Sequence, residues 1–140
     1  MLNSPIFIDT SYIYALISPR DQWHEKAMEW RQTISAEQSL LLTTEFILAE
    51  LADGLAAVNF RQAAVQAIQV LVTSPFVQII PATSALFQAG LKLYESRSDK
   101  DWGLTDCISF AVMTEYKLTD ALTTDDHFRQ AGFRALLLEP

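Results

Sequence analysis

Short apolar segments alternate with longer amphipathic segments along this chain, and this alternation strongly constrains the fold. The pattern predicts strands at 6–9, 39–43, 76–80, 120–123 and 134–138. Helices are expected at 21–33, 44–57 (ending around Gly54), 61–72, 84–96 and 105–116, and the last is almost wholly apolar. Strands separated by helices predict an α/β fold with a mainly parallel sheet, covered on both faces by right-handed crossovers.

Charge and length narrow the class of protein. The 140 residues suit one domain, 1–140, and the net charge of −7 argues against binding nucleic acid through bulk charge. The single cysteine, Cys107, lies in an apolar run and cannot form an internal disulfide, which fits a reducing cytosol. No apolar stretch reaches the length of a membrane helix, so we expect a soluble cytoplasmic protein with no membrane partner.

Four acids occupy informative positions. Asp9 and Asp125 each follow a predicted strand, and ligands of such sheets bind beyond the carboxyl ends of the strands. Glu50 and Asp106 lie on helices beside core-facing positions, where an unpaired carboxylate costs several kcal/mol. A divalent cation shared by all four would compensate them, and hard oxygen ligands suit Mg²⁺ or Mn²⁺.

Each acid also has a simpler interpretation. Asp9 could cap a helix that starts near Thr10, and Asp125 could belong to a turn. Asp106 could be a first-turn acid favoured by the helix dipole, and Glu50 could pair with a basic residue elsewhere. The case for a site therefore rests on the combination of the four.

Other acids serve as internal controls. Glu45 suits the first turn of a helix and projects away from Glu50, whereas Asp53, Asp120 and Asp126 have the pattern of surface or turn residues. None of these is assigned to the site.

Four segments together resemble a known family. They are IFIDTSYIYAL, TTEFILAEL, DWGLTDCISFAVM and ALTTDDHFRQAGF, and in this order they span nearly the whole chain. They resemble the PIN-domain ribonucleases, most closely the VapC-like toxins of VapBC toxin–antitoxin systems. The resemblance implies a single PIN domain folded as a three-layer α/β/α sandwich around about five strands. It also implies metal-dependent endonucleolytic cleavage of RNA with one or two Mg²⁺ or Mn²⁺ ions.

The resemblance carries over residue by residue. It assigns catalysis and metal binding to Asp9, Glu50, Asp106 and Asp125. Ser11 and Thr123 would orient carboxylates or a water molecule. A fifth acid, Asp101 or Asp99, would reach the metal through water, or would be an ordinary solvated loop acid.

A basic segment could guide RNA toward these acids. Lys92, Arg97 and Lys100 precede Trp102, which could stack on a base; the alternative is a solvated helix end with Trp102 covering the core. His127 is expected to be a packing and hydrogen-bonding residue rather than a general base, and Phe128 is expected to anchor its turn.

The resemblance also implies partners, namely an RNA substrate, a second copy in a homodimer and a small antitoxin. Trp23, Trp30 and Phe60 could contact them or belong to the core, and we favour the core for Trp30. A housekeeping RNA-processing nuclease and a non-catalytic binding module remain the alternatives. A dehalogenase-type phosphatase is disfavoured because Ser11 stands where that chemistry needs a second aspartate.

Overall fold

All five strands of the sheet are parallel. A computed structural model describes residues 4–140. The sheet order is β3-β2-β1-β4-β5, so β1 is the central strand. The strands are β1 (Ile6–Ile8), β2 (Leu41–Thr44), β3 (Val77–Ile80), β4 (Asp120–Leu122) and β5 (Arg134–Ala135).

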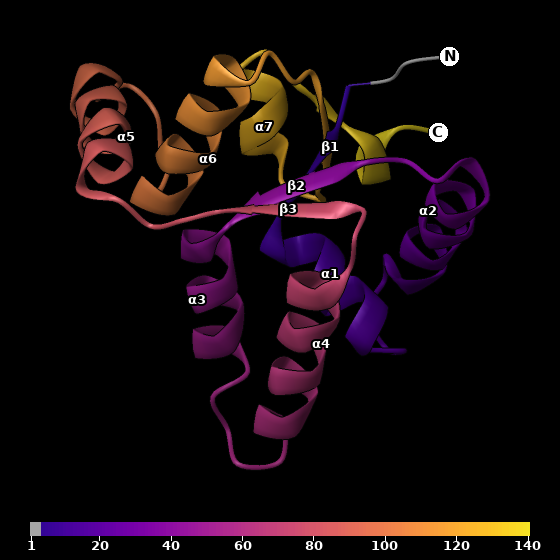
Figure 1. Ribbon diagram of the computed structural model, residues 1–140. Coiled ribbons are helices and arrows are strands. Elements are labelled where there is room, and N and C mark those ends of the chain that lie inside the picture. Colours follow the sequence, from indigo (N-terminus) through magenta and orange to yellow (C-terminus); the bar gives the residue numbers. More distant parts are fainter. Residues whose placement is uncertain (1–3) are drawn as a thin grey trace.

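Helices cover both faces of this sheet, as Figure 1 shows. The helices are α1 (Thr10–Ile17), α2 (His24–Glu37), α3 (Glu45–Gly54), α4 (Arg61–Thr73), α5 (Ser84–Ser96), α6 (Leu104–Glu115) and α7 (Asp126–Gln130). In Figure 1, α1, α3 and α4 lie below the sheet, and α5, α6 and α7 lie above it. The expected three-layer sandwich and its five-stranded parallel sheet are confirmed.

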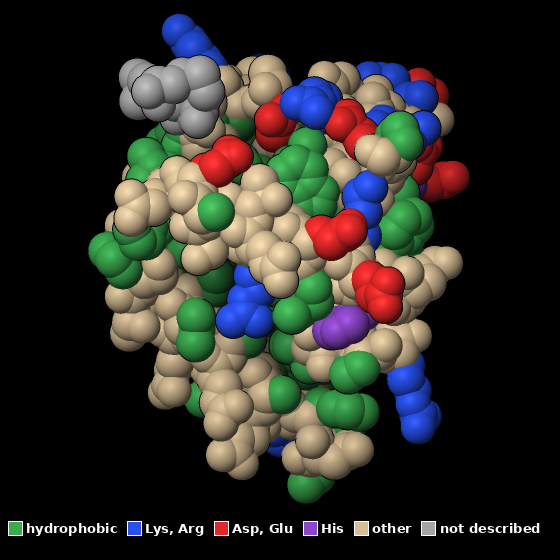
Figure 2. All heavy atoms as spheres, turned by 90° about the vertical axis from the view of Figure 1, so that its right-hand side faces the viewer, with side chains coloured by type: hydrophobic (Ala, Val, Ile, Leu, Met, Phe, Trp, Pro, Cys, Tyr) green, Lys and Arg blue, Asp and Glu red, His purple; other side chains and the backbone are tan. Residues whose placement is uncertain are grey.

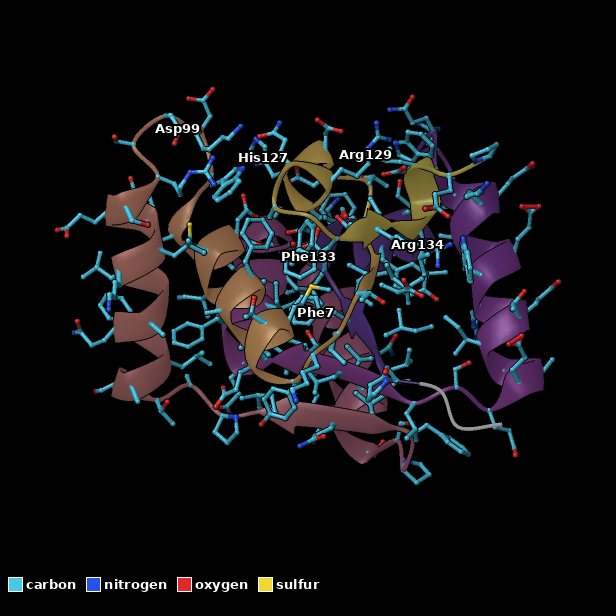
Figure 3. All side chains as sticks on the ribbon, turned by 90° about the horizontal axis from the view of Figure 1, so that it is seen from above. Phe7, Asp99, His127, Arg129, Phe133 and Arg134 are labelled. Atoms are coloured by element: carbon cyan, nitrogen blue, oxygen red, sulfur yellow. The ribbon has the colours of Figure 1, made fainter. Side chains whose placement is uncertain are left out.

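Alternating side chains of the strands divide the core in two. Phe7 packs into a cluster that includes Phe110 of α6 and Phe128 of α7, whereas Ile8 packs into a cluster that includes Tyr12 of α1 and Leu51 of α3. Successive residues of a strand point to opposite faces, so one short strand supplies both layers. Figure 3 shows Phe7 and Phe133 in the interior, while Asp99 lies on the loop between α5 and α6.

The last segment differs from its expected structure. Arg134 and Ala135 pair with β4, but Leu136–Leu138 forms a 3₁₀ turn (η1) instead of continuing the strand. Leu136 and Leu137 are both buried in the cluster that contains Ile8, and a turn places adjacent leucines against the core where a strand would send them to opposite faces. The prediction of a strand through Leu138 was therefore wrong.

Charge is dispersed over the face that carries α2. Figure 2 shows acidic and basic side chains intermingled there, so this face has no large patch of one sign. Within residues 4–140, none of the helices combines the length and apolar character needed to cross a membrane.

Candidate functional site

The carboxyl ends of β1, β2 and β4 bring the proposed site together. Phe7 pairs with Ala121 and Ile8 pairs with Leu122 in parallel register, so Asp9 lies beside Thr123. On the other side, β2 leads directly into α3, and Thr44 caps that helix by accepting a hydrogen bond from the Ile47 amide. Three adjacent strands thus open onto one edge, as expected for a ligand site in a parallel sheet.

Asp9 is held by hydroxyl groups rather than by basic side chains. It is 5% exposed, and its Oδ2 accepts hydrogen bonds from Thr123 Oγ1 at 2.7 Å and Ser11 Oγ at 2.8 Å. Each hydroxyl also accepts an amide hydrogen, from Asp125 at 3.0 Å and Thr124 at 3.0 Å respectively. The Asp9 carboxylate forms no capping hydrogen bond with α1, so capping does not explain it.

Glu50 is anchored to α1. Its Oε1 accepts a hydrogen bond from Thr10 Oγ1 at 2.5 Å, and its backbone carbonyl accepts one from the Tyr14 hydroxyl at 3.2 Å. Burial and the nearby Glu50 charge raise the pKa of Tyr14, so its hydroxyl remains a proton donor at neutral pH. A Cβ on Gly54 would lie 1.7 Å from the Tyr14 hydroxyl oxygen, which explains the glycine at that position.

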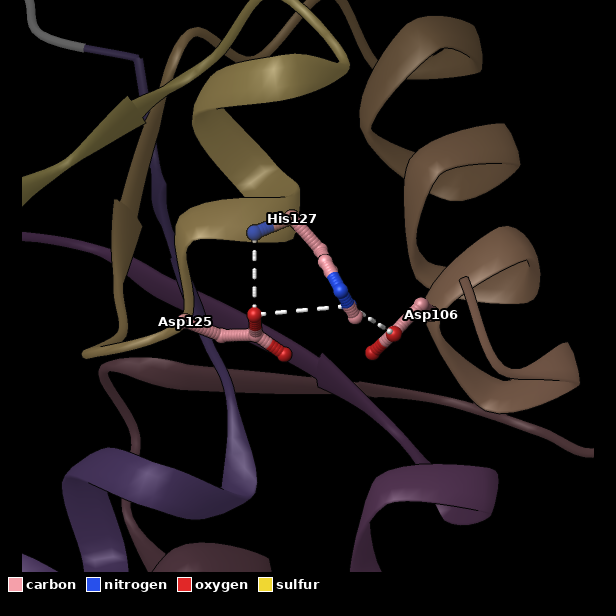
Figure 4. Close-up of side chains that lie close together, drawn as sticks. All are labelled: Asp106, Asp125 and His127. Carbon is pink, nitrogen blue, oxygen red and sulfur yellow. Dashed lines mark hydrogen bonds and ion pairs between the residues drawn. The ribbon is translucent and has the colours of Figure 1, made fainter. Parts of the chain in front are cut away.

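Asp106 and Asp125 meet at His127. The imidazole Nδ1 lies 3.1 Å from Asp106 Oδ2 and 3.4 Å from Asp125 Oδ1. Asp106 Oδ2 also accepts a hydrogen bond from the Gly103 amide at 3.2 Å, and Asp125 caps α7 through the His127 amide at 2.9 Å. The simpler roles considered for these two acids are therefore present, but both side chains also face the same space (Figure 4).

These residues line one open hollow of about 570 Å³. Its walls are Asp9, Thr10, Ser11, Tyr14, Glu50, Asp106, Thr124, Asp125, Asp126 and His127. Over residues 4–140, no lysine or arginine forms an ion pair with Asp9, Glu50, Asp106 or Asp125. The hollow is thus strongly acidic and has no permanently cationic side chain to balance it.

Burial and mutual repulsion alter proton affinity in the hollow. Burial raises the pKa of Asp9, and the charges of Glu50 and Asp125 raise it further against the effect of the two hydroxyls. Burial likewise raises the pKa of Asp106, with added repulsion from Asp125 and Asp9. For His127, burial opposes the charge, but the hydrogen bond with Asp106 and the nearby carboxylates outweigh it and raise its pKa. This chemistry suits a bound cation.

The potential metal ligands that lie closest together differ from the expected set of four carboxylates. Within the described chain, atoms of Asp106, Asp125 and His127 form a group lying within 4.8 Å of one another that could hold a metal ion. Asp9 and Glu50 line the same hollow outside this group, where they accept hydrogen bonds from Thr123, just after β4, and from Thr10 of α1 respectively.

The expected RNA-binding residues lie next to this hollow rather than in it. Trp102 is 5% exposed. Its ring packs edge-on against Phe110, with 5.1 Å between the ring centroids, and the Arg97 Cζ lies 4.9 Å from the Trp102 ring centroid on one face. The buried ring agrees with the alternative interpretation, in which Trp102 covers the core. Arg97, Lys100 and Asp101 line a neighbouring hollow of about 760 Å³, whereas Lys92 is exposed on α5 and lines neither.

The remaining loop and control acids have other partners. Asp99 forms an ion pair with Arg97 at 3.0 Å, and Asp120 forms one with Arg134 at 3.2 Å. Glu45 accepts a hydrogen bond from the Ala82 amide at 2.7 Å, and Asp53 is exposed. Asp126 reaches the rim of the acidic hollow but pairs with Arg129 at 3.1 Å.

Sequence reasoning missed Thr10 and Tyr14 and understated His127. Thr10 and Tyr14 are four residues apart on α1, so their spacing after Asp9 could have placed them on one face. His127 could have been noticed because it follows Asp125 by two positions, within reach of an Asx turn. Trp23 and Trp30 pack partly buried against the core, whereas Phe60 is 47% exposed.

Comparisons with known proteins agree with this architecture. The PIN domain family matches residues 6–134. A solved structure of VapC20 from Mycobacterium tuberculosis, described as a sarcin–ricin loop cleaving toxin, is 26% identical with a TM-score of 0.79 and covers 92% of this chain and 96% of its own. No curated protein sequence matches the chain significantly.

Two further structures share the fold at lower identity. FitAcB from Neisseria gonorrhoeae is 21% identical, with a TM-score of 0.63 over 93% of this chain and 94% of its own. VapBC2 from Rickettsia felis, bound to a DNA fragment from its promoter, is 12% identical with a TM-score of 0.66. The match covers 90% of this chain and 92% of the VapBC2 chain.

Proposed function

Because the chain belongs to the PIN-domain family, we propose that it is a metal-dependent endoribonuclease and the toxin of a toxin–antitoxin pair. The observation that carries the proposal is the acidic hollow, in which Asp9, Glu50, Asp106 and Asp125 converge with no lysine or arginine partner among residues 4–140. The similarity to VapC20 supports a nuclease toxin.

The residues of the hollow have different roles in the proposed mechanism. Asp9, Glu50, Asp106 and Asp125 would hold one or two Mg²⁺ or Mn²⁺ ions. Ser11 and Thr123, which donate hydrogen bonds to Asp9, would orient its carboxylate for that role. A bound ion of this kind lowers the pKa of water and neutralises charge on the scissile phosphate. Thr10 fixes Glu50 by its hydrogen bond, and Tyr14 supports the backbone of the same residue.

A cleavage assay tests this function directly. Total RNA is incubated with wild type and with Asp9→Asn, with Mg²⁺, with Mn²⁺ and with EDTA. We expect cleavage only by wild type with a metal, leaving 5′-phosphate and 3′-hydroxyl ends. Cleavage in EDTA, or cleavage that survives Asp9→Asn, would show that the mechanism is wrong. Failure to cleave with either metal would favour a non-catalytic binding module.

The substrate and the biological role need separate tests. VapC20 makes an RNA containing a sarcin–ricin loop the first defined substrate to try. A small neighbouring gene for a DNA-binding protein would favour a toxin over a housekeeping nuclease. Sedimentation analysis of the purified chain tests the homodimer, which is part of the same proposal.

An antitoxin would need an apolar docking surface near the hollow, and α1 provides one. A second hollow of about 730 Å³ lies between α1, α2 and α4, lined by apolar residues such as Ile13, Leu16 and Val70. The opposite face of α1 supplies Ser11 and Tyr14 to the acidic hollow. We propose that one antitoxin segment lies along α1 and contacts both hollows, and the similarity to VapBC2 supports such a partner.

A further inference from the structure

The ring of His127 occupies the space between two of the proposed metal-binding acids. Its Nδ1 is 3.1 Å from Asp106 Oδ2 on α6 and 3.4 Å from Asp125 Oδ1 before α7 (Figure 4). These acids are 19 positions apart and lie on different elements, as the numbering shows. One imidazole therefore links two separate parts of the site.

The backbone that carries this ring is anchored by the residue that follows it. Phe128 is fully buried, and its ring contacts Phe110 of α6 edge-on at 4.9 Å and Phe7 of β1 at 6.2 Å. The His127 amide also donates to Asp125 Oδ1 at 2.9 Å. The aromatic contact joins α7 to the helix that carries Asp106, so the backbone of His127 cannot move away from α6 without disturbing the core.

Each of the two carboxylates consequently has one oxygen that accepts a hydrogen bond and faces His127, and one oxygen that is free of such contacts. Asp106 Oδ2 receives the Gly103 amide and faces His127, and Asp125 Oδ1 receives the His127 amide and faces the ring. Among the described residues, no hydrogen bond reaches Asp106 Oδ1 or Asp125 Oδ2. In Figure 4 these free oxygens point to the same side, toward the indigo and purple helices α1 and α3.

We propose that His127 is a positioning residue that clamps Asp106 and Asp125, so that their free oxygens face the cation site shared with Asp9 and Glu50. This inference rests on the proposed function, because it concerns how the same hollow holds its metal. Outer partners of this kind orient carboxylate ligands and commonly set metal affinity. Nδ1 is engaged by carboxylates, so a clamp accounts for its position better than an exposed packing role does.

The test measures Mn²⁺ binding itself, by calorimetry and by electron paramagnetic resonance, on the full chain. His127→Asn keeps an amide N–H close to the place of Nδ1, whereas His127→Ala removes it and His127→Gln moves it outward. We expect Asn to bind Mn²⁺ within roughly threefold of wild type, and Ala and Gln to bind about 10- to 100-fold more weakly. Arg129→Ala, on the same short helix and paired with Asp126, is the matched control and should bind as wild type does.

Two results would overturn the clamp. If Asn binds as weakly as Ala, the ring nitrogen is a ligand rather than a positioning group, since an amide nitrogen does not replace imidazole on a metal. If Ala binds as tightly as wild type, the contact is packing only. Should Ala fail to fold in a thermal melt, the comparison of Asn with Gln decides. If wild type binds no Mn²⁺, the proposed metal-dependent function fails instead, a result that the wild-type titration alone identifies.

Discussion

The hydroxyl of Thr123 donates a 2.7 Å hydrogen bond to Asp9 Oδ2 across 114 positions of sequence. The same hydroxyl accepts the Asp125 amide at 3.0 Å, so it links the ends of β1 and β4. A single side chain thereby orients one proposed metal ligand and places the backbone of another.

Replacing this hydroxyl should affect both the fold and the site. Thr123→Val keeps the shape but leaves the part-buried Asp125 amide without its acceptor, which costs about 1 kcal/mol. Loss of Asp9 orientation should lower RNA cleavage about 10- to 100-fold. Urea denaturation and a cleavage assay measure the two effects. Thr119→Val, an exposed threonine before β4, should change neither; equal effects of the two variants would contradict this role.

The adjacent acids Asp125 and Asp126 should behave differently. Asp125→Asn should abolish RNA cleavage yet keep the helix cap, because asparagine caps as well as aspartate does. Asp126→Asn should retain most activity, because that side chain is 57% exposed and pairs with Arg129. Initial cleavage rates at saturating Mg²⁺ provide the comparison, and similar losses would mean that the wrong acid of the pair has been assigned to the site.

Stability should depend on pH and on metal together. Burial raises the pKa of Asp9 and Asp106 above the ordinary 3.8, so the folded metal-free protein binds more protons than the unfolded chain just above that pH. Stability should therefore fall as pH rises through the window between 3.8 and the raised values. A cation at 100 times its Kd should restore about 2.7 kcal/mol at neutral pH.

Thermal melts between pH 4 and 8, with EDTA or Mn²⁺, check this linkage. Asp9→Asn should melt higher than wild type in EDTA at pH 7, because it removes a buried charge, and should gain less from Mn²⁺. A metal-free wild type that becomes steadily more stable from pH 4 to 7, with no response to Mn²⁺, would exclude the linkage.

The close contact between α5 and α6 should not tolerate a larger residue at Gly90. A Cβ there would lie 2.2 Å from Ile108 Cγ1 and 3.0 Å from the Ile108 Cα. Gly90→Ala should therefore lose about 1–3 kcal/mol in urea denaturation despite alanine's better helix propensity. Gln88→Ala, exposed on the same helix, should be close to neutral, and a stabilised Gly90→Ala variant would refute the contact.

Antitoxin binding should depend on the apolar hollow beside α1. Val70 on α4 lines it and is 67% exposed, so Val70→Asp would place a charge at the interface. We expect at least about a tenfold weaker complex with the purified neighbouring-gene product, or about 1.4 kcal/mol, with RNA cleavage unchanged. Val58→Asp, 91% exposed and outside this hollow, is the control; loss of binding in both variants would argue against this surface.

Local sequence determined much of the architecture. Apolar segments of strand length predict the five strands, because the alternation of side chains along a strand is a local property of the backbone. The helix-length segments between them predict parallel pairing, because a helix returns the chain to the same edge of the sheet. The same pattern locates Asp9 and Asp125 at strand ends, where parallel sheets form their sites. The end of the chain was misjudged, because Leu136–Leu138 has strand-like composition but turns to bury adjacent leucines.

Only the tertiary structure decided which side chains meet. The sheet order puts Thr123 against Asp9, and the packing of Phe128 on Phe110 brings His127 to Asp106. Arg97 and Phe110 pack against Trp102, for which the sequence left both a stacking surface and a place in the core open. Such contacts depend on strand order and on side-chain packing between distant segments. Spacing along the chain therefore predicts at which edge of the sheet the acids lie, but not which side chains contact one another there.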